Sequence, residues 1–366
     1  MFKTSRSNSL KRIAFLLLAL SLAVIPSLSE AAYTYESFIP EWSEAVSSAV
    51  INNNGYIAGY DSYLRGFYYD AGGDPHELSA LSSWSYTWTT SINNTNNIVG
   101  YGETGGGSWK SYLYDTGADS YKTVADGLSG AEAYDINDSN YVVGSGYMDY
   151  GDGDIKVAFT YNNADSSYTS LRYEGTSNWT YANAINNSGI VVGGGDNGTT
   201  LTGFVYNGAW TSLLPDGWDI AEASDINNNG TVVGRGSGGW FSYNYGTEGA
   251  EIVTHALPAW ITSVDKININ NNGNVAGWGY DTDGYVKGFF YDGTYTEIIP
   301  DEWLSASATG LNDNDVIVGY GMDPDGITKG FIATPTSPVA PEPVSTILFA
   351  VGGAVLAGHR FLKRKN

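Results

Sequence analysis

The chain has 366 residues, 42% of them hydrophobic and 15% charged, with a formal net charge of −22. The absence of cysteine excludes disulfides, thiolate metal sites and cysteine catalysis. The acidic balance argues against a nucleic-acid partner, because phosphates require a basic face. The 47 glycines and 14% aromatic residues favour many short strands joined by tight turns.

Residues 1–32 are predicted to be a signal peptide with a helical apolar core. Four basic residues precede an apolar run at residues 13–25, and small residues near position 31 provide a cleavage site. An uncleaved anchor helix is the alternative. The run is shorter than the about 20 residues that span a bilayer comfortably, which favours cleavage.

One nine-residue phrase then recurs seven times, with starts separated by 41 to 49 residues. An aliphatic residue stands first, Asn second, Ile or Val seventh and Gly ninth. The copies begin at Ile51, Ile92, Ile136, Ile185, Ile226, Ile269 and Leu311. Asn, Asp and Gly accept the backbone of a tight turn, so each phrase predicts a β-hairpin. The closing Gly indicates a β-bulge or the close approach of another backbone.

Two further phrases complete each unit. The second is an aromatic strand running into a turn, as in Gly288-Phe-Phe-Tyr-Asp292. The third is an outer strand and a corner, as in Tyr295-Thr-Glu-Ile-Ile-Pro-Asp-Glu-Trp303. About four strands in about 43 residues is the size of one β-propeller blade.

The sequence therefore predicts an all-β, seven-bladed β-propeller over residues 33–334, with an open β-solenoid as the alternative. The last unit lacks its third phrase, and residues 33–42 (Tyr-Thr-Tyr-Glu-Ser-Phe-Ile-Pro-Glu-Trp) supply it. We expect the N-terminal strand to complete the last blade and close the ring. The first two phrases resemble the HAF extracellular-repeat family, which implies a propeller-like fold, although the usual His of the second phrase is replaced here.

A Pro-rich linker at residues 335–343 ends in Pro341-Glu342-Pro343, and residues 344–366 form an apolar segment with a basic end. The basic residues are Arg360, Lys363, Arg364 and Lys365. Hydropathy alone predicts a short transmembrane helix with its tail in the cytoplasm. The order of parts resembles the PEP-CTERM sorting signal of Gram-negative bacteria. This resemblance implies inner-membrane retention, cleavage by an exosortase and delivery to the cell surface, outer membrane or extracellular matrix.

Acidic loops are the candidate metal ligands. Asp281 and Asp283 occupy the same place in unit six as Asp323 and Asp325 in unit seven. Asp-x-Asp-Gly can present carboxylates to Ca²⁺. The alternative is ordinary turn chemistry, because both loops join strands and neither has a bidentate acid at an EF-hand spacing.

Recurring tryptophans precede six of the phrases and predict core packing between blades, with sugar stacking as the alternative. They are Trp42, Trp84, Trp179, Trp218, Trp260 and Trp303. His76 and His255 fall in outer strands and are expected to be surface residues. No motif of nucleophilic, phosphate-binding or zinc-dependent catalysis is present in the sequence, so no catalytic residue is assigned.

The favoured interpretation is a secreted, non-enzymatic binding or matrix protein. Its expected partners are signal peptidase and exosortase during processing, exopolysaccharide afterwards, and the membrane only transiently. A propeller glycosidase or polysaccharide lyase and a purely structural coat are the alternatives. Residues common to all units build the fold, so function belongs where one unit departs from the others, starting with unit three.

Overall fold

The computed structural model describes residues 33–151, 153–173, 179–196 and 199–336. The predicted signal peptide and the residues of the predicted sorting signal lie outside these ranges. Residues 33–334 form one compact unit. In the described part of the chain, no helix has the length and apolarity needed to cross a bilayer.

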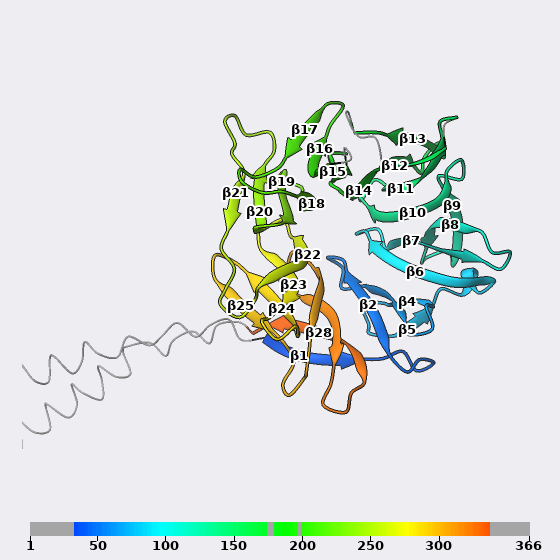
Figure 1. The fold of residues 1–366 in the computed structure, drawn as a ribbon. Coiled ribbons are helices and arrows are strands. Elements are labelled where there is room, and N and C mark those ends of the chain that lie inside the picture. Colours follow the sequence, from blue (N-terminus) through cyan, green and yellow to red (C-terminus); the bar gives the residue numbers. More distant parts are fainter. Residues whose placement is uncertain (1–32, 152, 174–178, 197–198, 337–366) are drawn as a thin grey trace, which may run out of the picture. The chain divides into compact units, whose positions relative to one another are not determined.

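This unit is built almost entirely of antiparallel β-structure, as predicted. The sheets surround a central opening in Figure 1, which is the arrangement of a β-propeller. Unit one forms a four-stranded sheet of β2 (Val46–Ile51), β3 (Ile57–Asp61), β4 (Gly66–Tyr69) and β5 (Pro75–Glu77). Unit two forms a second sheet of β6 (Trp84–Ile92), β7 (Asn97–Thr104), β8 (Trp109–Asp115) and β9 (Ser120–Val124). A short 3₁₀ helix, η1 (Ser79–Leu81), joins them.

Units three and four share one eight-stranded sheet. It consists of the antiparallel runs β10 (Ser129–Ile136), β11 (Tyr141–Asp149), β12 (Asp154–Asn162), β13 (Ser167–Leu171), and β14 (Trp179–Ile185), β15 (Val191–Asp196), β16 (Leu201–Tyr206), β17 (Trp210–Leu213). A single parallel pairing, Lys156 with Trp179, joins the two runs.

Three four-stranded sheets complete the described unit. The first contains β18 (Ala221–Ile226), β19 (Thr231–Gly236), β20 (Gly239–Asn244) and β21 (Val253–His255). The second contains β22 (Ser263–Ile269), β23 (Val275–Tyr280), β24 (Val286–Tyr291) and β25 (Tyr295–Ile298). The third contains β26 (Ser307–Leu311), β27 (Ile317–Met322) and β28 (Thr328–Pro335), together with β1 (Tyr33–Phe38). The first phrase is the turn between the first two strands of each unit. The second phrase is the third strand.

The N-terminal strand completes the last sheet, as predicted. β1 pairs with β28, so the two ends of the described unit share one sheet (Figure 1). Phe38 at the end of β1 also packs against Phe67 and Tyr69 of unit one, with ring centroids 6.4 and 5.1 Å apart. β1 therefore joins unit seven to unit one as well as covering an edge.

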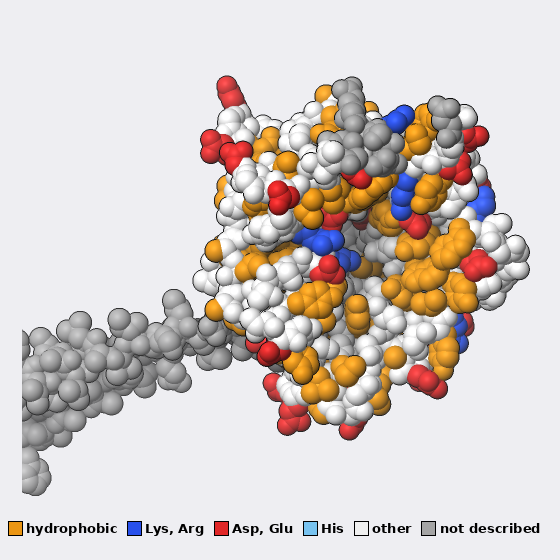
Figure 2. All heavy atoms as spheres, viewed as in Figure 1, with side chains coloured by type: hydrophobic (Ala, Val, Ile, Leu, Met, Phe, Trp, Pro, Cys, Tyr) orange, Lys and Arg blue, Asp and Glu red, His pale blue; other side chains and the backbone are white. Residues whose placement is uncertain are grey.

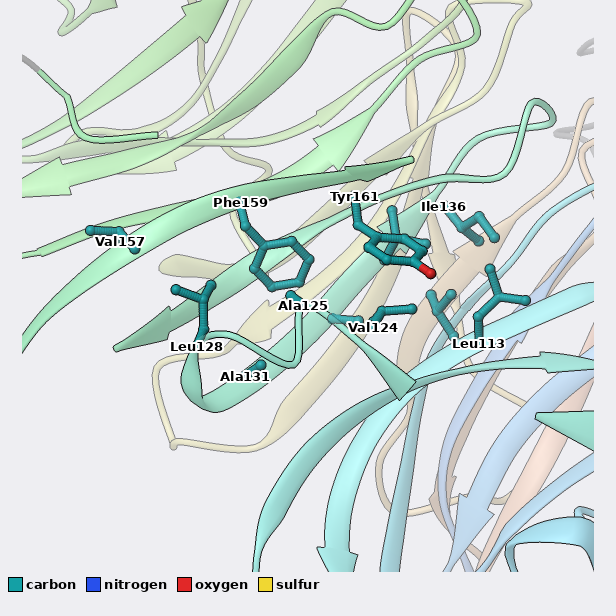
Figure 3. Close-up of a cluster of buried hydrophobic side chains, with 12 residues drawn as sticks. Leu113, Val124, Ala125, Leu128, Ala131, Ile136, Val157, Phe159 and Tyr161 are labelled. Carbon is teal, nitrogen blue, oxygen red and sulfur yellow. The ribbon is translucent and has the colours of Figure 1, made fainter. Parts of the chain in front are cut away.

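The hydrophobic cores lie between neighbouring sheets. One core joins Val99 and Leu113 of unit two to Phe159 and Tyr161 of unit three. Figure 3 shows Leu113, Phe159 and Tyr161 directed into one cluster. The aromatic residue of the second phrase is completely buried in every unit. These residues are Phe67, Tyr112, Phe159, Phe204, Phe241, Phe289 and Phe331.

Each of these buried aromatic residues lies opposite the Gly that closes the first phrase of the same unit. Gly144 pairs with Phe159, and Gly277 pairs with Phe289. A Cβ atom at Gly144 would lie 1.9 Å from the carbonyl oxygen of Glu132, beside a β-bulge of β10. The prediction of a bulge or close backbone approach at this glycine is confirmed.

Candidate functional site

The seven asparagine turns meet at one end of the central opening and are joined there by two circular sets of hydrogen bonds. The second residue of each phrase donates its side-chain amide to the backbone carbonyl of the next phrase's equivalent residue. The links run from Asn52 to Asn93, Asn137, Asn186, Asn227, Asn270, Asn312 and back to Asn52. This circle is uniform, because every unit contributes an asparagine side chain and a backbone carbonyl.

The third residue of each phrase forms the second circle. Its backbone N–H donates to the side-chain oxygen of the third residue in the next phrase. The links run through Asn53, Asn94, Asp138, Asn187, Asn228, Asn271, Asp313 and back to Asn53, at 2.8 to 2.9 Å. Side-chain and backbone groups of the turns are thus used in holding neighbouring units together.

The opposite end, which we call the mouth, differs from unit to unit. The residue after each closing Gly pairs across the sheet with a residue of the innermost strand. The pairs are Ser48–Tyr60, Trp88–Tyr101, Glu132–Ser145, Tyr181–Gly194, Glu222–Arg235, Lys266–Trp278 and Ser307–Tyr320. Four of these pairs line a central cavity of about 520 Å³. Figure 2 shows a hollowed face with charged side chains inside it and hydrophobic ones beside it.

A shifted β-bulge brings Lys266 into this layer. The bulge of β18 lies between Ala223 and Asp225, whereas that of β22 lies between Val264 and Lys266. Side chains alternate between the two faces of a strand, so moving the bulge changes which residues of the innermost strand face the cavity. Lys266 therefore pairs with Trp278, in the layer that Glu222 occupies in unit five.

Two carboxyl groups lie below the mouth. Asp135 accepts hydrogen bonds from the Ser91 hydroxyl (2.6 Å) and the Ile185 backbone N–H (2.9 Å). Asp225 accepts from the backbone N–H of Ile226 (2.7 Å) and Ile269 (2.8 Å). Both carboxyl groups thus connect neighbouring innermost strands, and they face the same cavity as Lys266.

Burial shifts the pKa of all three groups. It raises the pKa of Asp135 to about 6. Burial, together with the charge of Asp135, raises the pKa of Asp225 to about 7. Burial also lowers the pKa of Lys266, against the opposing effect of the two carboxylates. Groups whose pKa lies near neutral pH can take part in proton transfer. Burial in a structural role shifts the pKa in the same direction.

Charged residues at the mouth are paired with one another. Arg235 bridges Glu222 (2.8 Å) and Asp265 (3.3 Å). Lys156 pairs with Glu132 at 3.0 Å. The Tyr181 hydroxyl donates to Glu222 at 2.5 Å, and burial with this nearby carboxylate raises the pKa of Tyr181. These contacts join residues of units three to six in polar networks around the opening.

A second cavity, of about 540 Å³, opens between units three and four. It is lined by Tyr134, Tyr147, Asp154, Lys156, Trp179, Tyr181 and Asn183. The rings of Trp179 and Tyr181 stack at 5.1 Å with an interplanar angle of 18°. Unit three was the predicted place for a departure from the repeat, and this cavity lies at its boundary with unit four.

The recurring tryptophans mostly pack into the cores, as predicted. Trp84, Trp218 and Trp303 make edge-to-face contacts with the buried aromatics Tyr112, Phe241 and Phe331, at 5.7 to 6.1 Å. Trp260 packs against a hydrophobic core. Trp179 is the exception, because it lines the second cavity.

The recurring set leaves out the tryptophans that are most exposed at the mouth. Trp88 lines the central cavity and lies 5.1 Å from Trp109, which is 40% exposed. The signal was present in the sequence, since unit two has a second tryptophan four residues after Trp84. A search for shared residues overlooks it, because it occurs in one unit alone.

The acidic loops form tight turns. One carboxylate oxygen of Asp281 accepts the N–H groups of Asp283 and Tyr285. Asp323 does the same for Asp325 and Ile327 and also pairs with Lys329 at 2.7 Å. These contacts are those of ordinary tight turns, which the sequence offered as the alternative to Ca²⁺ binding. Within the described ranges, no group of three potential metal-ligating acids or histidines is present.

The two histidines of the body lie in outer strands, as predicted, but both make ring contacts. His76 stacks on Tyr68 at 4.6 Å and contacts Asp70 at 3.2 Å. His255 stacks on Trp240 at 3.7 Å, and burial lowers its pKa. Neither residue lies among those lining the central cavity.

Comparison with solved structures places the fold among β-propellers. Virginiamycin B lyase from Staphylococcus aureus superposes with a TM-score of 0.54 at 10% identity, over 82% of this chain and 99% of the lyase. The β-propeller domain of the Trilobed protease from Pyrococcus furiosus gives 0.52 at 11% identity, over 81% and 99%. At such low identities the likeness concerns the fold alone.

A third similar structure is the acylaminoacyl peptidase of Pyrococcus horikoshii, with a TM-score of 0.56 and 12% identity. The match covers 81% of this chain but 54% of the peptidase, so the chain spans about half of that enzyme. The model of a family described as a protein of unknown function (DUF3466) matches residues 106–212. No curated protein matches the sequence.

Proposed function

We propose that this chain is an exported, seven-bladed β-propeller that binds a cell-surface or matrix ligand at the mouth of its central cavity. Seven blades are supported by the closed circles of hydrogen bonds through the seven asparagine turns. The first and second phrases of the repeat unit resemble HAF-type extracellular repeats.

The observation that carries the proposal is the contrast between the two ends of the opening. Seven equivalent turns have the same contacts at one end, whereas seven equivalent strand pairs carry different chemistry at the other. A scaffold requires only the uniform end. A purely structural coat gives no reason for an aromatic pair in unit two, an ion pair in unit five and a buried lysine in unit six.

The test compares one substitution at the two ends. Ser48 lines the central cavity, and Ser188 is exposed on an asparagine turn. Immobilised protein of residues 33–334 would be exposed to surface material extracted from the producing cells, and retained carbohydrate and protein would be measured. We expect Ser48→Trp to reduce retention at least tenfold and Ser188→Trp to leave it unchanged. Equal retention by both variants would sink the assignment of the mouth as the binding face.

Export and sorting are tested separately. The proposal assigns Pro341-Glu342-Pro343 and the following basic residues to an exosortase signal of the PEP-CTERM type. Replacing the three residues by alanine should leave an unprocessed chain in the inner membrane, detected by fractionation and by mass spectrometry of the C-terminus. Normal release with an unchanged C-terminus contradicts the sorting proposal.

A propeller glycosidase or polysaccharide lyase is the second candidate. It is favoured by two carboxyl groups with raised pKa values facing one lysine in the central cavity. An enzyme would shorten the retained polysaccharide with time, and Asp135→Asn would abolish that shortening. Stable polysaccharide length in the presence of wild-type protein favours the binding role.

A further inference from the structure

Unit two carries an aromatic surface beside the central cavity, formed by the exposed Tyr86 and Trp109 and the half-buried Trp88 and Tyr101. Trp88 pairs with Tyr101, and both Tyr86 and Trp109 pair with Glu103 on the neighbouring strands. Residues directly opposite one another in a sheet lie on the same face, as do alternate residues along a strand. All four rings therefore belong to one face of the same sheet.

Three of these rings have a specific arrangement. Trp88 is nearly parallel to Tyr101 (5.6 Å, 21°) and to Trp109 (5.1 Å, 18°). The centroids of Tyr101 and Trp109 are only 6.4 Å apart. In a column, two stacking steps of about 3.5 Å each would separate the outer rings by about 7 Å or more. Tyr101 and Trp109 therefore lie side by side over the same face of Trp88.

This arrangement leaves a broad apolar surface available to a ligand. Tyr86 and Trp109 are each 40% exposed, although both belong to regular strands. The fold does not require a ring at the position of Trp88, because Ser48, Glu132 and Glu222 stand there in other units. Exposed aromatic surfaces that packing does not explain are typical of binding sites.

Two cations at the mouth are already paired, beginning with Lys156, which contacts Glu132 at 3.0 Å on unit three. Glu103 lies on the same face as the four rings, and its carboxylate disfavours an anionic ligand. Arg235 is paired with Glu222 further round the mouth. A strongly charged ligand would have to break these pairs. An uncharged ligand with an apolar flat face and many hydroxyl groups needs no such rearrangement.

The neighbouring cavity offers a second contact point of similar design. Tyr134 packs edge-on against Tyr101 at 6.2 Å and also lines the cavity between units three and four. That cavity combines the stacked rings of Trp179 and Tyr181 with the polar groups of Asp154 and Asn183. Two aromatic sites flanking polar groups match an extended chain of rings better than one small molecule.

We propose that the ligand is a neutral glycan chain whose sugar rings stack on Tyr101 and Trp109 and extend toward the cavity between units three and four. Sugar rings present C–H groups on their flat faces and hydroxyl groups at their edges. The faces suit the aromatic surface, and the edges suit the polar groups beside it. This inference rests on the proposed binding function of the mouth.

The test is calorimetric titration of residues 33–334 with hexasaccharides of known charge. The neutral probes are β-1,4-linked hexamers of glucose and of mannose, and the charged probes are hexagalacturonate and the chitosan hexamer. We expect a neutral hexamer to bind at least tenfold more tightly than either charged one. Trp109→Ala should weaken that binding at least tenfold, while Tyr141→Ala, an exposed aromatic near the asparagine turns, should change it less than twofold.

Three results would overturn the inference: neither neutral hexamer binds, a charged hexamer binds most tightly, or Trp109→Ala binds as the wild type does. Failure here differs from failure of the proposed function. If Ser48→Trp abolishes retention of surface material but the neutral hexamers do not bind, the mouth takes a ligand of other chemistry. If Ser48→Trp has no effect on retention, the mouth itself is not the binding face.

Discussion

The asparagine at the second position of each phrase forms hydrogen bonds through both its side-chain oxygen and its side-chain nitrogen. The Oδ1 atom of Asn227 accepts the N–H groups of Asn229 (3.1 Å) and Thr231 (2.9 Å) within its own turn. Its Nδ2 group donates to the Asn270 carbonyl of the next unit at 3.0 Å. Asp could accept both turn bonds but could not donate the third, because an ionised carboxylate has no proton. Every unit therefore carries asparagine here.

The pH dependence of stability should reveal the buried carboxyl groups of the central cavity. The pKa values of Asp135 and Asp225 are raised to about 6 and about 7, so the folded state retains their protons where the unfolded state has lost them. Their contribution favours folding at pH values below about 4 and is lost as the pH rises to about 7. We expect the free energy of unfolding to fall between pH 5 and pH 8.

Asp225→Asn removes one of these titrations, so its free energy of unfolding should depend less steeply on pH over that range. Denaturant unfolding at pH 5, 6.5 and 8 measures the slopes. Asp283→Asn, which alters an exposed turn carboxyl, is the matched control and should keep the wild-type slope. Parallel curves for all three proteins would contradict the assignment.

Each hairpin depends on a glycine where its two strands approach most closely. In units such as three and five the innermost strand has a β-bulge beside the glycine, and the bulge directs a backbone carbonyl toward it. In units one and six the bulge lies further along the strand from the turn. The aromatic ring of the third strand occupies the remaining space, so Gly234 lies between the Glu222 carbonyl and the Phe241 ring. The bulge, glycine and aromatic residue act together, and this is why they recur together.

Gly144→Ala should destabilise the fold by about 3 kcal/mol, because a Cβ atom 1.9 Å from the Glu132 carbonyl oxygen forces the backbone to move. Gly106→Ala is the control, since its nearest neighbour would lie 3.9 Å away. Equilibrium unfolding of both variants measures the difference. Equal stability of Gly144→Ala and Gly106→Ala would show that the approach is not tight in solution.

At the scale of the whole molecule, closure depends on contacts between residues far apart in the chain. Asn312 donates to the Asn52 carbonyl at 3.3 Å, and the Thr309 hydroxyl donates to the Ala49 carbonyl at 2.6 Å, both across 260 positions. β1 adds the fourth strand of the last sheet and brings Phe38 against unit one. The ends of the repeat array thus stabilise each other.

Deleting residues 33–40 should lower the thermal midpoint and promote association, because it exposes the edge of β28 and removes the Phe38 packing. Thermal denaturation and light scattering at several protein concentrations would measure both effects. A chain beginning at Tyr33 is the control. A monomeric deletion variant with an unchanged midpoint would mean that β1 does not contribute to closure.

The all-β class, the repeat unit, the turns and the closing strand could all be predicted from the amino-acid sequence. Turn chemistry at Asn and Gly is local, and a seven-fold repetition of it leaves little ambiguity. The pairing of β1 with β28 was also predictable, because residues 33–42 repeat the phrase that the last unit lacks. These features follow from residues that every unit shares.

The places where the non-repeating residues meet could not be predicted from the sequence, because they depend on how the sheets pack. The displaced bulge of β22 brings Lys266 into the central cavity beside Asp135 and Asp225, although they belong to different units. The side-by-side arrangement of Tyr101 and Trp109 likewise depends on strand register. Register and bulge position depend on packing against neighbouring sheets, which periodicity does not encode. The repeat therefore specified the scaffold, while packing between units assembled the candidate site.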